Sequence, residues 1–135
     1  MSHIKIFSPG ELGKPLGQYS QITRVKASEL IFIAGQLSTD VVGSVVGAND
    51  FEAQCMQVFR NIECALSSIG GQWLNVVQFT TYMVHSQDIA KFMEFRKQHF
   101  PRFFPDGAYP PNTLLIVDRL VQEPFLVEVQ TIAAL

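Results

Sequence analysis

Hydrophobic positions recur with two different spacings along this chain, and each spacing predicts a different kind of element. Two stretches carry apolar residues every three or four positions, which is the spacing of an amphipathic helix. Six shorter stretches are rich in β-branched and aliphatic residues, as strands are. The predicted helices span 51–69 and 89–100, and the predicted strands span 4–7, 21–26, 30–35, 76–84, 109–120 and 126–134.

Residues at the helix ends support these bounds. Asn49, with Glu52 three positions later, resembles a capping box and predicts the start of the first helix. The pair Gly70–Gly71 follows its last apolar position and predicts its end. The polar segment 85–88 precedes the second helix. Pro101 is expected to stop that helix, because proline lacks the N–H that continues the hydrogen-bond ladder.

The strands on either side of residues 27–29 are expected to form a hairpin. The second of them is almost wholly apolar over 30–34, which favours a central place in the sheet, and the pair Gly35–Gln36 ends it. A turn at 122–124 separates the last two strands. The element order predicts an α+β fold with a mixed sheet of about six strands and two helices on one face.

Polarity in the last strand indicates how the sheet is covered. The alternate positions from Val127 to Ala133 form a core face, whereas the other side is mostly apolar but carries Glu128 and Gln130. A sheet that is apolar on both sides must be covered on both sides, and two helices cover one. A second copy of the chain is the simplest cover for the other side, so we predict a closed homo-oligomer.

Length and composition predict the number of domains and the solubility of the protein. With 135 residues, the chain is expected to form one domain that spans 1–135. Hydrophobic residues make up 47% and charged residues 16%, so we expect some apolar surface to be buried against a partner. The start lacks the apolar segment of a secretion signal, and no later segment is apolar over the roughly 18 residues of a membrane span. We therefore expect a soluble, cytoplasmic protein.

Charge and metal-ligand spacing argue against several classes of function. A formal net charge of −2 and ten scattered Lys and Arg residues offer no basic patch for nucleic acid. His3, His85 and His99 are far apart in the chain and show no metal-ligand spacing, so no metal is expected. Cys55 and Cys64 fall on opposite sides of the first helix and cannot bridge each other, so we expect buried reduced thiols.

Several segments together resemble one known family. They are Gly17–Gln21, Ile31–Gln36, Glu52–Gln54, Asn61–Ile62, Val76–Thr81 and Val127–Ala133. On these motifs, which cover nearly the whole chain in the family's order, the sequence is similar to the Rid (RidA, YjgF-like, endoribonuclease L-PSP-like) family. The resemblance implies a chorismate-mutase-like fold and a homotrimer with ligand clefts between its subunits.

The resemblance also implies an activity. Rid proteins hydrolyse enamine and imine intermediates, such as 2-aminoacrylate, to 2-keto acids and ammonia without a cofactor. In that mechanism an Arg after a Pro-Ala pair grips the substrate carboxylate, and a Glu in the last strand positions the attacking water. A loop Tyr and the backbone after the central strand complete the cleft. By this resemblance Glu128 is the catalytic residue, and Tyr19 and Gly35 bind substrate.

The chain departs from the family's pattern where the substrate carboxylate is bound. The segment Pro110–Thr113 stands where the family has Pro-Ala-Arg-Ser, so Asn112 replaces the Arg. Asn112 can donate neutral hydrogen bonds but not the bidentate, charge-assisted pair that Arg offers. Met93 and Arg96 stand where the family's second helix often has Asn and Tyr. We assign Asn112, Thr113 and Met93 to substrate binding, and expect weak or absent 2-aminoacrylate deaminase activity.

Other cations could take the place of the missing Arg. Lys14 on the glycine-rich loop and Arg24 in the second strand are candidates, whereas Arg119 is expected to form a solvated ion pair beside Asp118. For Glu128, two roles stay open. It is either a water-positioning carboxylate whose pKa is raised by burial, or the partner of a basic residue across a subunit interface.

These residues lead to two functional hypotheses. The first is a trimer that binds a small carbonyl- or imine-bearing metabolite between subunits and hydrolyses an imine or enamine other than 2-aminoacrylate. The second is a non-catalytic ligand-binding or chaperone-like trimer. RNA cleavage, which the endoribonuclease name suggests, is less favoured because the chain is acidic and lacks a basic groove. Neither nucleic acid nor a membrane is expected as a partner.

Overall fold

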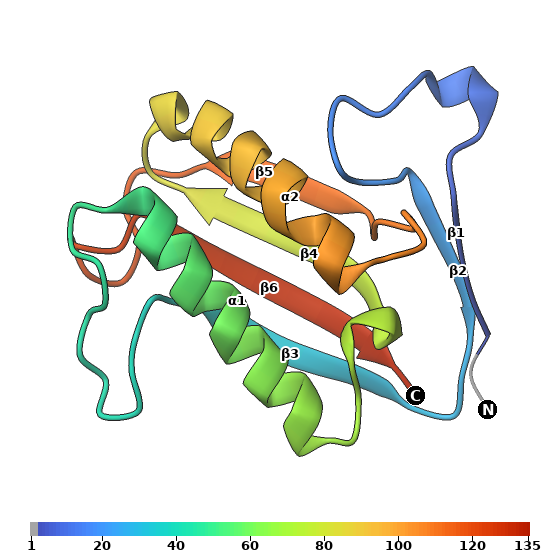
Figure 1. The fold of residues 1–135 in the computed structure, drawn as a ribbon, viewed down its shortest axis with the longest axis horizontal. Helices are drawn as coiled ribbons and strands as arrows, with labels where there is room; N and C mark the ends of the chain where they lie inside the picture. The colour runs from blue at the N-terminus through green and yellow to red at the C-terminus, as the bar shows by residue number, and fades with distance from the viewer. Residues whose placement is uncertain (1–2) are drawn as a thin grey trace.

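The computed structural model describes residues 3–135 and centres on a four-stranded mixed sheet with two helices packed on one face (Figure 1). Two further strands form a separate antiparallel ribbon. In chain order the helices and strands are β1 (His3–Phe7), β2 (Ile22–Lys26), β3 (Leu30–Gln36), α1 (Phe51–Ser68), β4 (Val76–Met83), α2 (Ile89–Phe103), β5 (Asn112–Ile116) and β6 (Val127–Ala134). Short 3-10 turns lie at Gly10–Leu12, Trp73–Asn75 and Ser86–Asp88.

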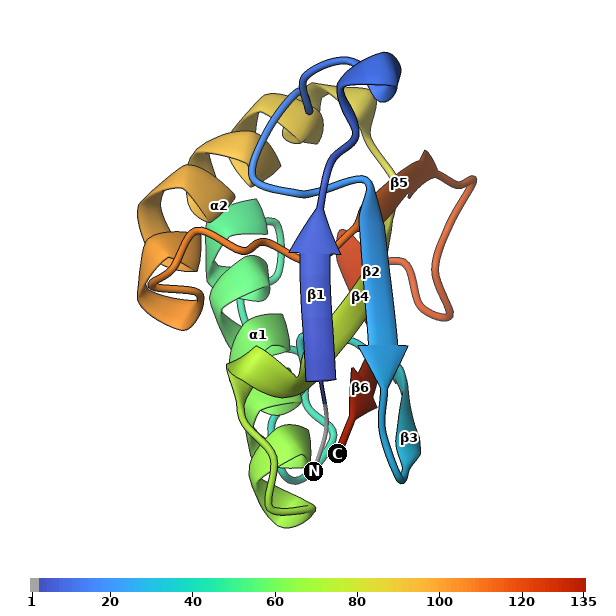
Figure 2. The same ribbon diagram turned by 90° about the vertical axis from the view of Figure 1, so that its right-hand side faces the viewer.

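The strand order in the main sheet is β3-β6-β4-β5. The last strand, β6, runs antiparallel to both of its neighbours, whereas β4 and β5 are parallel. The expectation of one sheet with about six strands was wrong, because β1 and β2 pair with each other instead. Figure 2 shows their ribbon standing beside the main sheet, where the Thr23 hydroxyl donates to the Val77 carbonyl at 2.8 Å.

The hairpin expected around residues 27–29 does not form. The N–H groups of Ser28 and Glu29 donate to the Leu135 carbonyl at 2.9 and 3.1 Å, and the Leu135 N–H donates to the Glu29 carbonyl at 3.0 Å. These bonds turn the chain into β3, which pairs with β6 and lies at the edge of the main sheet, not at its centre. Backbone partners that are distant in sequence therefore decide where β3 pairs.

The helices follow the predicted periodicity, but α1 is capped one residue later than expected. Asp50, not Asn49, is the N-cap residue, and its Oδ1 accepts a hydrogen bond from the Ala53 N–H at 3.0 Å. The glycine stop is confirmed, since Gly70 adopts a left-handed φ of 72° directly after the helix. Within residues 3–135, neither helix is long and apolar enough to cross a bilayer.

Aromatic packing explains why α2 continues past Pro101, where the sequence predicted its end. Phe103 stacks on Trp73 with ring centroids 4.4 Å apart, and both rings are buried. The Phe104 N–H donates to the Phe100 carbonyl at 2.8 Å and closes the last turn. Burial of these rings offsets the hydrogen bond that proline cannot make.

The two cysteines differ in their surroundings. Cys55 is buried in the core, as expected, but Cys64 is exposed, so the prediction of two buried thiols was wrong for Cys64. The two positions lie on opposite sides of α1, and only one of those sides faces the sheet. Burial holds the pKa of the Cys55 thiol well above its ordinary value, which makes this thiol a poor nucleophile.

The face of the main sheet opposite the helices is open in this chain. Along β6 the alternate residues from Val127 to Ala133 are buried, as predicted, whereas Gln130 is exposed. On β3, Phe32 and Leu30 are 70% and 55% exposed. An apolar strip of the sheet thus lacks a cover within residues 3–135, although sheets of this kind are covered on both sides.

Candidate functional site

Glu128 lies on the open face, near the start of β6 and beside Gly35 of β3. The β3–β6 register shifts between Ile33 and Gln36, which brings the Gly35 backbone against the Glu128 side chain. A Cβ at residue 35 would overlap the carboxylate, so the close approach requires glycine. A hollow of about 580 Å³, here called the Glu128 hollow, is lined by Ala34, Gly35, Tyr82, Val117, Arg119, Leu120, Val121, Glu128 and Gln130.

The Glu128 carboxylate is half-buried and unpaired. Within residues 3–135, no hydrogen bond or ion pair engages its side chain. Burial raises the pKa of this carboxyl above its ordinary value, because the low-dielectric surroundings disfavour the charged form. A raised pKa makes the carboxylate a better proton acceptor, so the arrangement fits a group that takes a proton from water.

Arg119 also lines the Glu128 hollow, but its guanidinium is engaged by its own loop. Nη1 forms an ion pair with Glu123 at 3.0 Å, and not with Asp118 as expected. Nε donates to the Leu120 carbonyl and Nη2 to the Val121 carbonyl, each at 3.1 Å. Arg119 therefore stabilises the loop that borders the hollow.

Asn112 lies on the opposite face of the sheet from Glu128. In the strand register, Asn112 pairs with Phe79 and Glu128 pairs with Tyr82. Position 82 of β4 is three residues after position 79, and an odd offset along a strand places two side chains on opposite faces. Asn112 Oδ1 accepts a hydrogen bond from the buried Thr81 hydroxyl at 2.8 Å. Within one chain, Asn112 and Glu128 do not meet.

Thr113, the next residue along β5, faces the other way from Asn112. It pairs with Thr80 of β4 and is exposed. Since Thr80 also pairs with Gln130 of β6, Thr113 lies on the open face with Glu128. It is not among the residues that line the Glu128 hollow.

Tyr19 and Met93, the other predicted site residues, come together around Arg96 of α2. The Arg96 Cζ lies 5.7 Å from the centre of the Tyr19 ring and 4.7 Å from that of the Phe92 ring. Gly17 faces the same group, because a Cβ there would lie 3.2 Å from Arg96 Nη2 and 3.4 Å from Met93 Cε. We call these five residues the Arg96 cluster.

Arg96 is a buried cation without a partner. Its side chain is 4% exposed, and its Nε and Nη1 atoms make no hydrogen bond within the described residues. Burial lowers the pKa of Arg96 to about 10, so the guanidinium is still protonated at neutral pH. The ion pairs found between residues 3 and 135 are Lys91–Asp88 and Arg119–Glu123, and neither involves Arg96. Fully buried charges are rare in proteins unless they are paired.

In the sequence, Arg96 stands out only as a departure from the family's pattern. A signal was nevertheless present, because Arg96 lies four residues after Phe92 and four before Phe100, within the apolar stripe of α2. A charge in that position faces the core. The sequence could not show that no carboxylate accompanies it there.

Lys14 and Arg24, the two further cations that the sequence suggests for the site, lie elsewhere. Lys14 is exposed on the loop before Tyr19. Arg24 is exposed on β2, opposite Lys5 of β1, and borders a hollow on the ribbon. Neither lines the Glu128 hollow.

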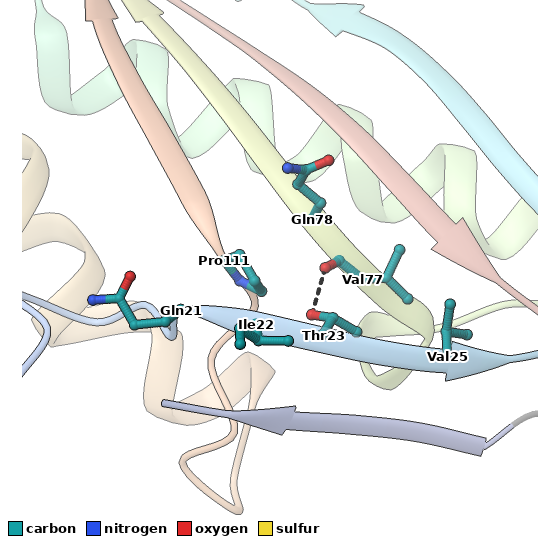
Figure 3. Close-up of a pocket in the computed structure, with 7 residues that line it drawn as sticks. All are labelled: Gln21, Ile22, Thr23, Val25, Val77, Gln78 and Pro111. Carbon is teal, nitrogen blue, oxygen red and sulfur yellow. Dashed lines mark hydrogen bonds between the residues drawn. The ribbon is translucent and has the colours of Figure 1, made fainter. Parts of the chain in front are cut away.

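A further hollow lies between the ribbon and the main sheet (Figure 3). Its volume is about 330 Å³, and its lining consists of Gln21, Ile22, Thr23, Val25, Val77, Gln78 and Pro111. It contains none of the residues assigned to the site. Within residues 3–135, no group of three or more His, Cys, Asp or Glu side chains could hold a metal ion.

Solved structures define the class of fold. A protein of the Rid family from Yersinia pestis, YyfB, superposes with a TM-score of 0.86 at 27% identity, and the match covers 98% of each chain. Escherichia coli TdcF with bound serine superposes with a TM-score of 0.71 at 21% identity, over 82% of this chain and 84% of that one. The chain therefore has the α+β YjgF-like fold.

Sequence comparison gives the family. The family model for endoribonuclease L-PSP matches residues 11–135. A RutC family protein of Pyrococcus horikoshii is 32% identical over 120 residues, which cover 89% of each chain. The chain belongs to the endoribonuclease L-PSP family, the Rid family that its motifs resemble.

Proposed function

We propose that the protein is a homotrimer that binds a small carbonyl- or imine-bearing metabolite in clefts between its subunits and hydrolyses an imine or enamine. The exposed Phe32 and Leu30 support assembly, because another copy that covered them would remove apolar surface from water. The placement of Asn112 and Glu128 on opposite faces supports a shared cleft, since an interface can bring residues from the two faces near one ligand.

The observation that carries this proposal is the unpaired Glu128 carboxylate beside Gly35. The carboxylate takes a proton from water while the water oxygen bonds to the carbon of a protonated imine. Glu128 then returns that proton to the amine nitrogen of the adduct. The C–N bond breaks as the hydroxyl releases its proton to solvent, and a ketone and ammonia leave. The reaction consumes one water and needs no cofactor.

Asn112 supports a substrate other than 2-aminoacrylate. In this proposal Asn112 stands in place of the family's substrate-binding Arg. Its Oδ1 already accepts from Thr81, which leaves neutral amide N–H groups for a ligand. Charge-assisted hydrogen bonds are about twice as strong as neutral ones, so 2-aminoacrylate should be held poorly at this position. That TdcF, which has the same fold, was solved with bound serine supports a small metabolite as the ligand class.

Substitution of the carboxylate tests the proposal. We expect Glu128→Gln to lower imine hydrolysis by about 100-fold or more, because it removes the proton acceptor while keeping the shape of the side chain. The assay measures ammonia release from imines generated in place from a panel of amino acids. Glu94→Gln, at an exposed position on α2, is the matched control and should keep the wild-type rate. A Glu128→Gln protein as active as the control would refute the role.

The same assay distinguishes the proposed hydrolase from the alternative, a non-catalytic binder. A wild-type protein that binds keto acids but releases no ammonia from any imine is a non-catalytic binder or chaperone-like trimer. Size-exclusion chromatography with light scattering gives the mass of the assembly, and a monomer at micromolar concentration would remove the intersubunit cleft from the proposal.

A further inference from the structure

The Arg96 cluster holds a charge that the folded chain does not balance. The charged groups nearest in sequence on α2 are Lys91, which pairs with Asp88 at 3.5 Å, and the exposed Glu94 and Lys97. The Tyr19 hydroxyl accepts from the Leu16 N–H at 3.1 Å, so it is tied to its own loop. Among residues 3–135, nothing offers Arg96 a carboxylate.

Such an arrangement is costly for the folded chain. Desolvation of a charge is unfavourable unless hydrogen bonds and an opposite charge replace the lost water. Two guanidinium nitrogens, Nε and Nη1, are shielded from water and have no acceptor. The Phe92 and Tyr19 rings lie within cation–π distance of the group, but they provide no hydrogen-bond acceptor for its edges. The edge of a guanidinium matches a carboxylate in shape and charge.

Gly17 packs closely against one of those edges. Its φ does not fall in the left-handed region, in contrast to Gly13 on the same loop, so its backbone does not require glycine. Instead, glycine permits the close approach of the loop to the helix, because even a Cβ would lie 3.2 Å from Arg96 Nη2. The third guanidinium nitrogen, Nη2, is not among the atoms shielded from water, so a ligand can reach the group on this side.

We propose that Arg96 binds the carboxylate of the ligand, and so supplies from α2 the cation that Asn112 does not supply from β5. The ligand class is a small monocarboxylate, such as a 2-keto acid or the imino acid that precedes it. One guanidinium flanked by aromatic rings balances one negative charge, which fits a carboxylate better than a doubly charged phosphate. The imine chemistry rests on the proposed function, but carboxylate binding at Arg96 can be measured without turnover.

Binding of pyruvate and 2-oxobutyrate, with pyruvamide and inorganic phosphate as comparison probes, tests the proposal by calorimetry. We expect Arg96→Met to weaken keto acid binding at least tenfold, because it removes the charge-assisted hydrogen bonds to the carboxylate. Binding of the uncharged pyruvamide should not change. Arg60→Met, at an exposed position on α1, is the matched control and should bind as wild type does.

A second measurement keeps the test independent of the folding of the variant. In wild-type protein, the Nε–H resonance of Arg96, assigned by its loss in Arg96→Lys, should shift when 2-oxobutyrate is added. Equal keto acid affinity in wild type and Arg96→Met, or an unmoved Nε–H resonance, would overturn the proposal. So would phosphate binding more tightly than either keto acid, or a wild-type protein that binds neither.

Two further outcomes separate this inference from the proposed function. Glu128→Gln should lose hydrolysis but keep keto acid affinity within threefold, so each role can fail without the other. If Arg96→Met dissociates the assembly while Arg60→Met does not, then Arg96 is an ion-pair partner across an interface, and the ligand assignment is wrong.

Discussion

The Glu128 hollow and the Arg96 cluster each contain one charged group without a partner. Burial shifts the pKa of both groups, but the consequence for the charge of each group at neutral pH is different. In both places low-dielectric surroundings favour the neutral form. The pKa of Glu128 is raised from its ordinary value, which makes the carboxylate a better proton acceptor. The pKa of Arg96 falls to about 10 and stays above neutral pH. The same physical cause therefore yields a proton acceptor in one region and a lasting cation in the other.

The two regions also differ in what holds them in place. Glu128 is on β6, between two hydrogen-bonded neighbours, and faces the open side of the sheet. Arg96 projects from α2 under a loop that contains Gly17 and Tyr19. A sheet fixes the proposed proton acceptor, whereas a helix and a loop hold the charge that is proposed to recognise a ligand. Each role can therefore be disrupted by itself.

The largest effect is expected from Gly35→Ala, which fills the space that the Glu128 carboxylate uses. The new Cβ would overlap that side chain, so the carboxylate must move away from its present position. We predict a loss of imine hydrolysis of about 100-fold, comparable with removal of a general base. Gly10→Ala, where a Cβ meets open space, is the control. An unchanged rate in Gly35→Ala would show that the contact does not position the carboxylate.

The second largest effect is expected in the pH dependence of the hydrolysis rate. Glu128 must be ionised to take a proton from water, and burial raises its pKa, so it becomes protonated at a higher pH than a free glutamate. We therefore expect kcat/KM to fall about tenfold per pH unit on the acid side, with a midpoint above 4.5. This acid limb should disappear in the residual activity of Glu128→Gln. A wild-type profile that is flat down to pH 4.5 would contradict the assignment.

Local patterns predicted most elements of the fold but not how the strands pair. The bounds of α1, β4 and β6 follow from apolar spacing over many residues. The division into two sheets instead depends on contacts such as Thr23 with Val77 and Glu29 with Leu135, whose partners are more than fifty residues apart. Alternation in 21–26 shows that a strand forms there, but it does not show which neighbour the strand joins.

For the candidate site too, the sequence predicted individual residues but not how strand pairing arranges them. The motifs identified Gly35 and Glu128, and the structure brings them into contact. Asn112 was grouped with Glu128, but the face on which a strand residue points depends on register, which is set by distant partners. The unpaired charge of Arg96 could be recognised only in the folded structure. Its position in an apolar stripe is visible in the sequence, whereas the lack of an opposite charge is a property of the packed core.

A smaller effect is expected on stability when the buried cation is replaced. The pKa of Arg96 is lower in the folded chain than in the unfolded one, so ionisation opposes folding at every pH below about 10. Arg96→Met keeps most of the volume and removes that cost. We predict that the ligand-free variant gains about 1 to 3 kcal/mol in its free energy of unfolding, measured by urea denaturation at pH 7. A loss of stability relative to Arg60→Met would instead indicate an acidic partner from another subunit.

The smallest predicted effect concerns the close contact between Gly17 and Arg96. Gly17→Ala places a Cβ 3.2 Å from Arg96 Nη2, which is a tight contact with the mobile end of a long side chain. The guanidinium can move away by a few tenths of an ångström, so we expect stability to change by no more than about 0.5 kcal/mol. Carboxylate binding should weaken about threefold, because a bidentate pair depends on geometry more than a single contact does. Calorimetric titration with 2-oxobutyrate, with Gly10→Ala as the control, measures the change. Tighter binding in Gly17→Ala would show that the ligand does not enter beside residue 17.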